Sequence, residues 1–294
     1  MKIYILLSLG LLFFCFSTPK PYKKAKKQHW MYVKDSLLMS AYEMSNGEYN
    51  AYLKDLKSQN QLTAYKIAMP DTNVWANDPK LKFNQPFVKF YFQHPGYSDY
   101  PLVGVTHQQA IAYCDWLTQK TNKDPKRVFK KVWVRLPTQA EWKYAAGAGN
   151  PNRNYPWQGE FLRNSKGMFL ANYKTIGDEN LAVDSNGNVV VSKCKTIVKT
   201  TIDHKTDTTY YNYHDCASGY GSFITVRLKS YFPNELGLYN MAGNVSELLA
   251  DNKQYIGGDW SSIAYYLKLN TPTRTLNKSL STVGFRYVIE VLEF

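Results

Sequence analysis

The chain has 294 residues, and 44% of them are hydrophobic, which suits one large domain or two small ones with a sizeable core. Its 24 tyrosines and 7 tryptophans fit a loop-rich fold or a recognition surface better than a helical bundle. The formal charge of +13 is partly local, because five lysines lie between residues 20 and 27.

The N-terminus has the pattern of a targeting signal. Residues 4–16 form an apolar run after Lys2, as in the core of a secretory signal peptide. The run is too short to cross a bilayer comfortably, which favours export. We predict a signal peptide over residues 1–17; the alternatives are a lipoprotein signal with Cys15 lipidated and an uncleaved anchor. Export predicts a periplasmic or outer-membrane-associated protein and argues against nucleic acid as a partner.

Residues 18–30 are predicted to form a basic arm, and folded sequence is expected to begin near Met31. Such an arm can contact anionic lipid, a cell-wall polymer or an acidic partner, so membrane association through the N-terminus is one expectation. The simpler interpretation, which we take as the expectation, is a solvated, disordered leader.

Along the folded part, residues 32–39 predict short strands. Four apolar residues between 49 and 56 then recur at helical spacing and predict a helix. Residues 57–100 carry few periodic signals, and four prolines interrupt them. We therefore expect a long irregular passage there.

Two threonines have the pattern of helix N-caps. Thr106 is followed by Gln109 at the position of a capping-box partner, which predicts a helix to about residue 120. A short strand is predicted over 132–136, and Thr138 caps a further helix over 139–146.

Residues 174–218 read as an insertion, because turn signals such as Asn186-Gly187 alternate there with β-forming runs and predict hairpins. Cys194 and Cys216 flank its polar part and are able to pair, although two cysteines do not prove a bridge. Cys114 lies in an apolar helical pattern and is predicted to be a buried free thiol. Few helices, many short strands and long loops predict an α+β fold with little regular structure.

Several separated segments resemble the formylglycine-generating-enzyme (sulfatase-modifying factor) domain. The resemblance covers about residues 40–290 and implies a compact α+β fold related to C-type lectins. Two elements are specific together: Leu-Pro-Thr-x-Ala-Glu-Trp from 136 and Gly-Leu-Tyr-x-x-x-Gly-Asn-Val-x-Glu from 237. The matching segments are 42–49, 100–106, 110–117, 135–146, 155–157, 171–173 and 237–247, followed by Gly257-Gly258 and Gly284-Phe285-Arg286.

The resemblance implies a copper site that this sequence lacks. Oxidases of the family hold copper with two cysteine thiolates after a Gly-Gly element, and those positions fall here on Ser262 and Leu267. A hydroxyl and an isobutyl group are not ligands for Cu(I), so we expect no copper and no oxidase activity. In the family a further cysteine often follows Gly-Phe-Arg and pairs with the helix cysteine. Tyr287 stands there, so Cys114 lacks that partner.

The resemblance also implies calcium at the Gly-Asn-Val-x-Glu loop. The ligands would be Asn244 and Glu247 with the carbonyls of Gly243 and Val245, and Asn172 belongs to a second family site. The alternative is that Asn244 and Glu247 only satisfy the turn through hydrogen bonds.

Aromatic residues mark a candidate binding surface near the family's substrate groove. Trp260, Tyr265 and Tyr266 have side chains that can grip an extended peptide or a glycan. For Trp260 core packing is the simpler interpretation.

The functional hypothesis follows from the retained scaffold and the missing thiolates. Residues 69–75 and 91–101 resemble the non-catalytic gliding-motility and type IX secretion lipoproteins of Bacteroidota. We expect a catalytically silent binding or structural module of the cell envelope, with an envelope protein, peptide or glycan as partner. The alternatives are a sulfatase-maturing oxidase or other enzyme using the same groove, and a lectin-like binder.

Overall fold

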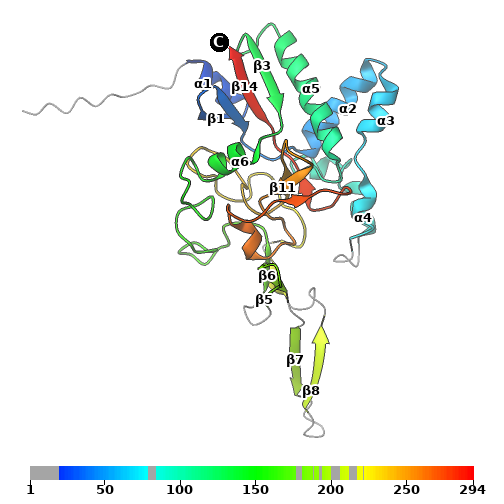
Figure 1. Ribbon diagram of the computed structural model, residues 1–294. Helices are drawn as coiled ribbons and strands as arrows, with labels where there is room; N and C mark the ends of the chain where they lie inside the picture. Colours follow the sequence, from blue (N-terminus) through cyan, green and yellow to red (C-terminus); the bar gives the residue numbers. More distant parts are fainter. Residues whose placement is uncertain are drawn as a thin grey trace, which may run out of the picture.

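The computed structural model describes residues 20–78, 84–176, 181–187, 189–191, 194–199, 206–211, 217–220 and 222–294. It is a mixed α/β structure with few helices and several small sheets, which confirms the predicted fold class (Figure 1). Among the described residues no helix is long and apolar enough to cross a membrane.

The first sheet brings distant parts of the chain together. Its strands are β1 (Trp30–Lys34), β2 (Leu37–Ser40), β3 (Lys131–Arg135) and β14 (Val288–Glu293), in the order β1-β2-β14-β3. All neighbours are antiparallel, and Ile289 at the centre pairs with Leu38 on one side and Val134 on the other.

Helices α2 (Asn46–Ser58), α3 (Leu62–Ala68) and α5 (His107–Lys123) lie beside this sheet (Figure 1). The predicted capping box of Thr106 and Gln109 is confirmed at the start of α5. Thr138 likewise caps α6 (Gln139–Ala146). A third capping box at the start of α2 joins Ser45 to Glu48. Each box satisfies backbone N–H groups that the first helical turn leaves unpaired.

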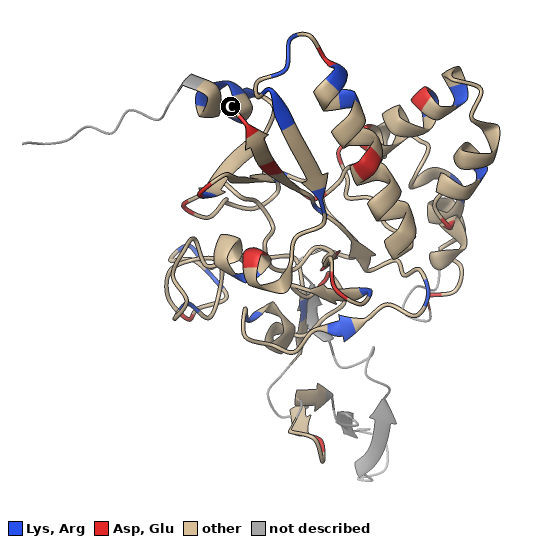
Figure 2. Ribbon diagram, turned by 45° about the horizontal axis from the view of Figure 1, so that its top comes forward, with Lys and Arg blue, Asp and Glu red and all other residues tan. Residues whose placement is uncertain are grey.

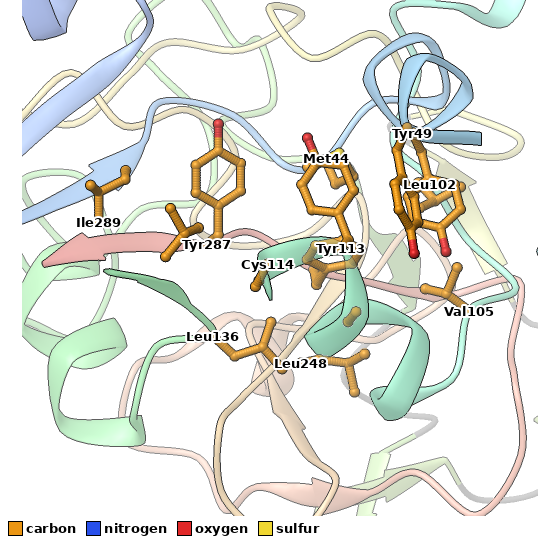
Figure 3. Packing of buried hydrophobic residues seen from close by; sticks show 14 of the residues in the cluster. Met44, Tyr49, Leu102, Val105, Tyr113, Cys114, Leu136, Leu248, Tyr287 and Ile289 are labelled. Carbon is orange, nitrogen blue, oxygen red and sulfur yellow. The ribbon is translucent and has the colours of Figure 1, made fainter. Parts of the chain in front are cut away.

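The core between these helices and the sheet is rich in aromatic side chains, as Figure 3 shows. Cys114 is buried there as a free thiol, as predicted. Tyr287 is also buried, and its hydroxyl accepts a hydrogen bond from Trp30 Nε1 at 3.3 Å. The rings of Tyr287 and Tyr113 have centroids 6.2 Å apart, so packing joins helix α5 to the residue that precedes β14.

The second sheet carries the family-like motifs. Its order is β12 (Arg274–Thr275), β11 (Gln254–Ile256), β10 (Ser246–Leu248) and β13 (Val283–Gly284), and β10 and β13 run parallel. A second buried cluster, which includes Trp142 of α6, packs against it.

The predicted hairpins of the insertion are present. β4 (Lys174–Ile176) pairs with β9 (Ala217–Tyr220) at its base. Between them β5 (Leu181–Val183) pairs with β6 (Val189–Val191), and β7 (Cys194–Lys199) pairs with β8 (Thr206–Tyr211). Cys216 lies outside the described residues, as does the whole predicted signal with Cys15, so the predicted Cys194–Cys216 bridge stays a prediction.

Two expectations from the sequence were wrong. The basic arm is not a disordered leader where it is described, because α1 (Lys20–Lys27) is helical and its Ala25 is fully buried. Residues 57–100 are also more regular than expected. They contain α3, α4 (Gln85–Phe90) and the short 3₁₀ turns η1 (Thr72–Val74) and η2 (Pro95–Tyr97).

Candidate functional site

A cavity of about 590 Å³ opens beside the Gly257-Gly258 turn. Its wall comes from residues 71–78, strands β6, β11 and β12, the segment 259–266 and the loop 278–282. Both glycines have positive φ, +103° and +69°, and a Cβ on Gly258 would lie 2.9 Å from the Tyr266 carbonyl oxygen. Position 258 therefore needs glycine, because only a residue without a side chain lets the turn pack this closely against the backbone of Tyr266.

Asp259 is the centre of a polar network on this wall. It is 2% exposed, and its Oδ2 accepts a hydrogen bond from Ser262 Oγ at 2.7 Å. Its Oδ1 accepts hydrogen bonds from the backbone N–H of Ser261 at 3.0 Å and from Ser261 Oγ at 2.8 Å. The network fixes the hydroxyl of Ser262, which lines the cavity.

Arg274 completes the network from β12. Its Nη2 donates to Asp259 Oδ2 at 3.2 Å and to Ser246 Oγ at 3.0 Å. The guanidinium lies 4.8 Å from the ring centroid of Tyr255 and 4.7 Å from that of Tyr266, so two aromatic faces hold it in place. One third of the Arg274 side chain remains exposed.

The two positions that hold copper in the family's oxidases have different surroundings here. Ser262 reaches the cavity, whereas Leu267, in the 3₁₀ turn η4 (Ala264–Leu267), is fully buried. Leu267 packs in an apolar cluster with Tyr155, Ala171 and Tyr173. The cysteine whose side chain is described, Cys114, belongs to a different cluster. The described residues therefore offer no pair of thiolates at this site.

The predicted aromatic surface is only partly present. Trp260 does not belong to it, and the core-packing interpretation is confirmed: its side chain is 2% exposed, it stacks at 6.3 Å on Trp75, and its Nε1 donates to the Ser281 carbonyl. Tyr266 lines the cavity. Tyr265 is half-buried and packs edge-on against Tyr266 at 5.2 Å, so it supports the wall.

A buried charged network lies at the Gly-Asn-Val-x-Glu loop. Arg286 Nε donates to both carboxylate oxygens of Glu247, at 2.8 and 2.7 Å, and Trp142 Nε1 donates to Glu247 Oε2 at 2.6 Å. Glu43 accepts hydrogen bonds from the amides of Asn240 and Asn244, at 3.0 and 2.8 Å. Burial raises the pKa of Glu43 from 4.5 to about 7, although Arg286 and the two amides oppose the rise.

These contacts bear on the predicted calcium ligands. Both oxygens of Glu247 accept hydrogen bonds, and Asn244 Oδ1 accepts the backbone N–H of Val226 at 2.8 Å. Asn172 Nδ2 donates to the Ile224 carbonyl at 2.8 Å, while its Oδ1 has no partner within the described part of the chain. The backbone of Gly243 packs against Asn172, and Val245 lies in an apolar cluster.

The arrangement fits the alternative, in which these side chains satisfy the loop through hydrogen bonds, better than it fits a calcium ion. A cation at Glu247 would have to displace Arg286. Within the described ranges, no three His, Cys, Asp or Glu side chains are grouped to hold a metal ion. Calcium stays a prediction, and the function proposed below does not depend on it.

Sequence reasoning missed Glu43, Asp259 and Arg274 as site residues. Asp259 offered a signal, because it directly follows the Gly-Gly turn where the family has serine. Arg274 and Glu43 offered no signal in the sequence, because only folding brings Arg274 to Asp259 and Glu43 to Asn244. Glu43 lies 201 residues from Asn244 in sequence.

The protein is therefore a mixed α/β domain with a polar cavity beside the Gly257-Gly258 turn. A copper centre at this place would need two thiolates, and the described residues do not supply them. Comparison with known proteins agrees: the chain belongs to the sulfatase-modifying factor enzyme 1-like domain family, whose profile matches residues 14–291.

Individual relatives are distant. The chain is 24% identical over 234 residues to the formylglycine-generating enzyme of Mus musculus, which covers 74% of this chain and 49% of the mouse protein. It is 27% identical over 118 residues to the inactive C-alpha-formylglycine-generating enzyme 2 of Mus musculus, covering 38% and 32% of the two chains. The structure of PvdO from Pseudomonas aeruginosa is 21% identical, with a TM-score of 0.44 over 86% of this chain and 80% of that one. The chain thus spans about half the length of the mouse enzyme it matches.

Proposed function

We propose that this protein is a catalytically silent member of its family that binds a polar chain, a peptide or a glycan, in the cavity beside Ser262. The observation that carries the proposal is that Ser262 and Leu267 stand where the family's oxidases have the two copper-binding cysteines. Ser262 donates a hydrogen bond to Asp259, and Leu267 is part of the core. Oxygen activation by Cu(I) needs soft thiolate ligands, and neither residue supplies one.

The chemistry of the cavity supports a polar ligand. Its wall presents hydroxyl groups, the carboxylates of Asp71 and Asp78, and the cations of Arg274 and Lys278, next to the ring of Tyr266. Donors, acceptors and an aromatic face together suit a chain with alternating polar and apolar groups. One similar protein, from Mus musculus, is itself named inactive, which supports this part of the proposal.

The place of action that we propose is the cell envelope. The apolar run at 4–16 predicts export, and residues 69–75 and 91–101 resemble gliding-motility and type IX secretion lipoproteins. In this proposal the protein is a structural or recognition subunit of such an assembly. Affinity purification from the native envelope, followed by mass spectrometry, tests it. Secretion-assembly subunits are the expected partners, and a sulfatase would favour the maturation alternative.

The catalytic half of the proposal has a direct test. The purified protein is loaded with Cu(I) without oxygen and then incubated in air with a cysteine peptide of the sulfatase type and a thiol reductant, with an active family oxidase as positive control. We expect no Cu(I) bound at the Ser262 site and no aldehyde product by mass spectrometry. Turnover would overturn the proposal and restore the enzyme alternative.

The binding half is tested on a glycan array and a peptide library. We expect ligands that lose at least tenfold affinity in Tyr266→Ala and Arg274→Gln. A matched control is Phe161→Ala, which removes an aromatic ring that is 80% exposed and does not belong to the cavity lining. Equal binding by all three variants would show that the cavity is not the binding site.

A further inference from the structure

The positive charge of the chain is concentrated in two segments. Residues 20–27 and 123–131 together carry ten basic side chains and one acidic side chain, a net charge of +9 out of +13 for the whole chain. The first segment is helix α1, and the second joins α5 to β3.

The fold brings these two segments to one end of the molecule. The ring of Tyr22 in α1 lies 6.0 Å from that of Phe129 in the second segment, and both contact Phe294 at about the same distance. Ala25 and Phe129 share the main core cluster. Ala25 and Phe129 are buried, whereas the lysines around them are exposed. Figure 2 shows the blue parts of α1, the start of β3 and the loop before it gathered near the C-terminus.

We call this surface the basic face. It comprises seven exposed lysines: Lys23, Lys24, Lys26, Lys27, Lys126, Lys130 and Lys131. Three acidic side chains lie at or near its margin: Asp35, Asp124 and Glu293, which is opposite Lys131 in the sheet. Asp124 is partly engaged, because its Oδ1 accepts the Lys126 backbone N–H at 2.8 Å. Positive charge therefore dominates the face.

Aromatic side chains flank the basic face. Tyr32 is 46% exposed and packs edge-on against Tyr22 at 5.0 Å, and Phe294 is 59% exposed. Exposed rings beside clustered lysines are the combination found where proteins meet lipid headgroups, because the rings enter the interface while the ammonium groups pair with phosphates.

We propose that the basic face docks the protein on an anionic lipid surface, as a site separate from the cavity. A lipid surface is favoured over an acidic protein because, in the sequence, α1 follows closely on an apolar run. The run at 4–16 ends only four residues before Lys20, where α1 begins. Whether that segment is an anchor or is removed, α1 is the first described element after the membrane-directed part of the chain.

Docking in this way gives the protein an orientation. In Figure 1 the basic face lies at the end with α1 and β1, while β5 and β6 lie at the opposite end. The cavity has part of its wall on β6. The part of the cavity wall on β6 therefore lies far from the proposed lipid contact (Figure 1).

Sedimentation with lipid vesicles tests the proposal on the full purified protein. Vesicles of pure phosphatidylcholine are compared with vesicles that also contain phosphatidylglycerol at about one third. We expect binding to the anionic vesicles to be about tenfold stronger at low salt and to disappear at about 0.5 M NaCl, because electrostatic attraction to lipid is screened within a Debye length.

The key variant replaces Lys23, Lys24, Lys26 and Lys27 with Gln, and the matched control replaces Lys54, Lys57, Lys66 and Lys89. All eight lysines are exposed, so both variants change the net charge equally and should keep the same unfolding temperature. We expect the first variant to lose at least tenfold affinity for anionic vesicles and the control to lose less than threefold. If the protein carries a lipid anchor, both variants and the unsubstituted protein carry it, so it does not contribute to the difference in affinity between them.

Several outcomes overturn the proposal. One is equal binding to neutral and anionic vesicles, and another is an equal loss in both variants, which would mean that net charge alone attracts the lipid. A third is retention by purified cell-wall polymer or an acidic protein without binding to anionic vesicles. The cavity tests above are independent, so either proposal can fail alone.

Discussion

Arg286 and Glu247 form an ion pair whose side chains are 0% and 1% exposed, with Nη2 2.6 Å from Oε1. Arg286 Nη2 also donates to the Tyr239 carbonyl at 2.8 Å, and its Nη1 donates to the Ser40 carbonyl at 3.2 Å. The guanidinium of Arg286, just before β14, thus contacts three other parts of the chain: β2, the loop that contains Tyr239, and β10.

Removing one partner of this pair should strongly destabilise the fold. Glu247→Ala leaves the Arg286 charge and the Trp142 N–H buried without their acceptor, so we expect the free energy of unfolding to fall by about 3–5 kcal/mol. Urea titration followed by tryptophan fluorescence measures it. The control is Arg153→Ala, which breaks a pair whose Glu235 side chain is 45% exposed. We expect that loss to stay below about 1 kcal/mol, and equal losses would contradict the prediction.

Glu43 should make stability depend on pH near neutrality. Its pKa is raised from 4.5 to about 7 by burial, so between these values the folded state binds a proton that the unfolded state has released. Its contribution is therefore fully present below pH 4.5 and is lost as pH rises through 7. The free energy of unfolding should fall by on the order of 3 kcal/mol from pH 4.5 to 8 through this group. Urea midpoints over this range should fall less in Glu43→Gln; parallel profiles would rule out this assignment.

Cys114 should be chemically inert in the folded protein. Burial raises the pKa of its thiol, and the thiolate is the reactive form. In a variant with Cys15, Cys194 and Cys216 replaced by Ser, we expect a thiol reagent to react at least 100-fold more slowly in buffer than in concentrated urea. Rapid labelling in buffer would mean that the core opens around α5.

The two former copper positions should respond differently to truncation. Leu267→Ala removes a fully buried side chain and is expected to lower the free energy of unfolding by about 2–5 kcal/mol. Ser262→Ala removes a hydrogen bond to Asp259 on the cavity wall and should lower it by about 1 kcal/mol. Thermal and urea unfolding of both variants provide the comparison. Similar losses would show that position 262 is as structural as position 267.

The parts of the fold that the sequence predicted correctly depend on local rules. The N-caps Thr106 and Thr138 and the Asn186-Gly187 turn act within a few residues, so their patterns are visible in the chain itself. The burial of Cys114 also follows from its place in an apolar helical pattern.

What the sequence did not predict depends on distant contacts. Helix α1 is mostly lysine, and only its packing of Tyr22 and Ala25 against Phe129 distinguishes it from a solvated leader. The position of Arg274 over Asp259 likewise needs β11 and β12 to be paired first. For Trp260 the sequence left two interpretations open, because an aromatic residue after a glycine turn can face either the cavity or the core. Its packing against Trp75 places it in the core.

Strand β14 lies between β2 and β3, so it completes the first sheet although it is the last strand in the sequence. During synthesis, β2 and β3 therefore emerge before the strand that lies between them. Residues 30–287 therefore lack the centre of this sheet, and long-range pairing of this kind is slow. We expect the chain to remain loosely structured until Val288–Glu293 have been synthesised and can pair with both neighbouring strands.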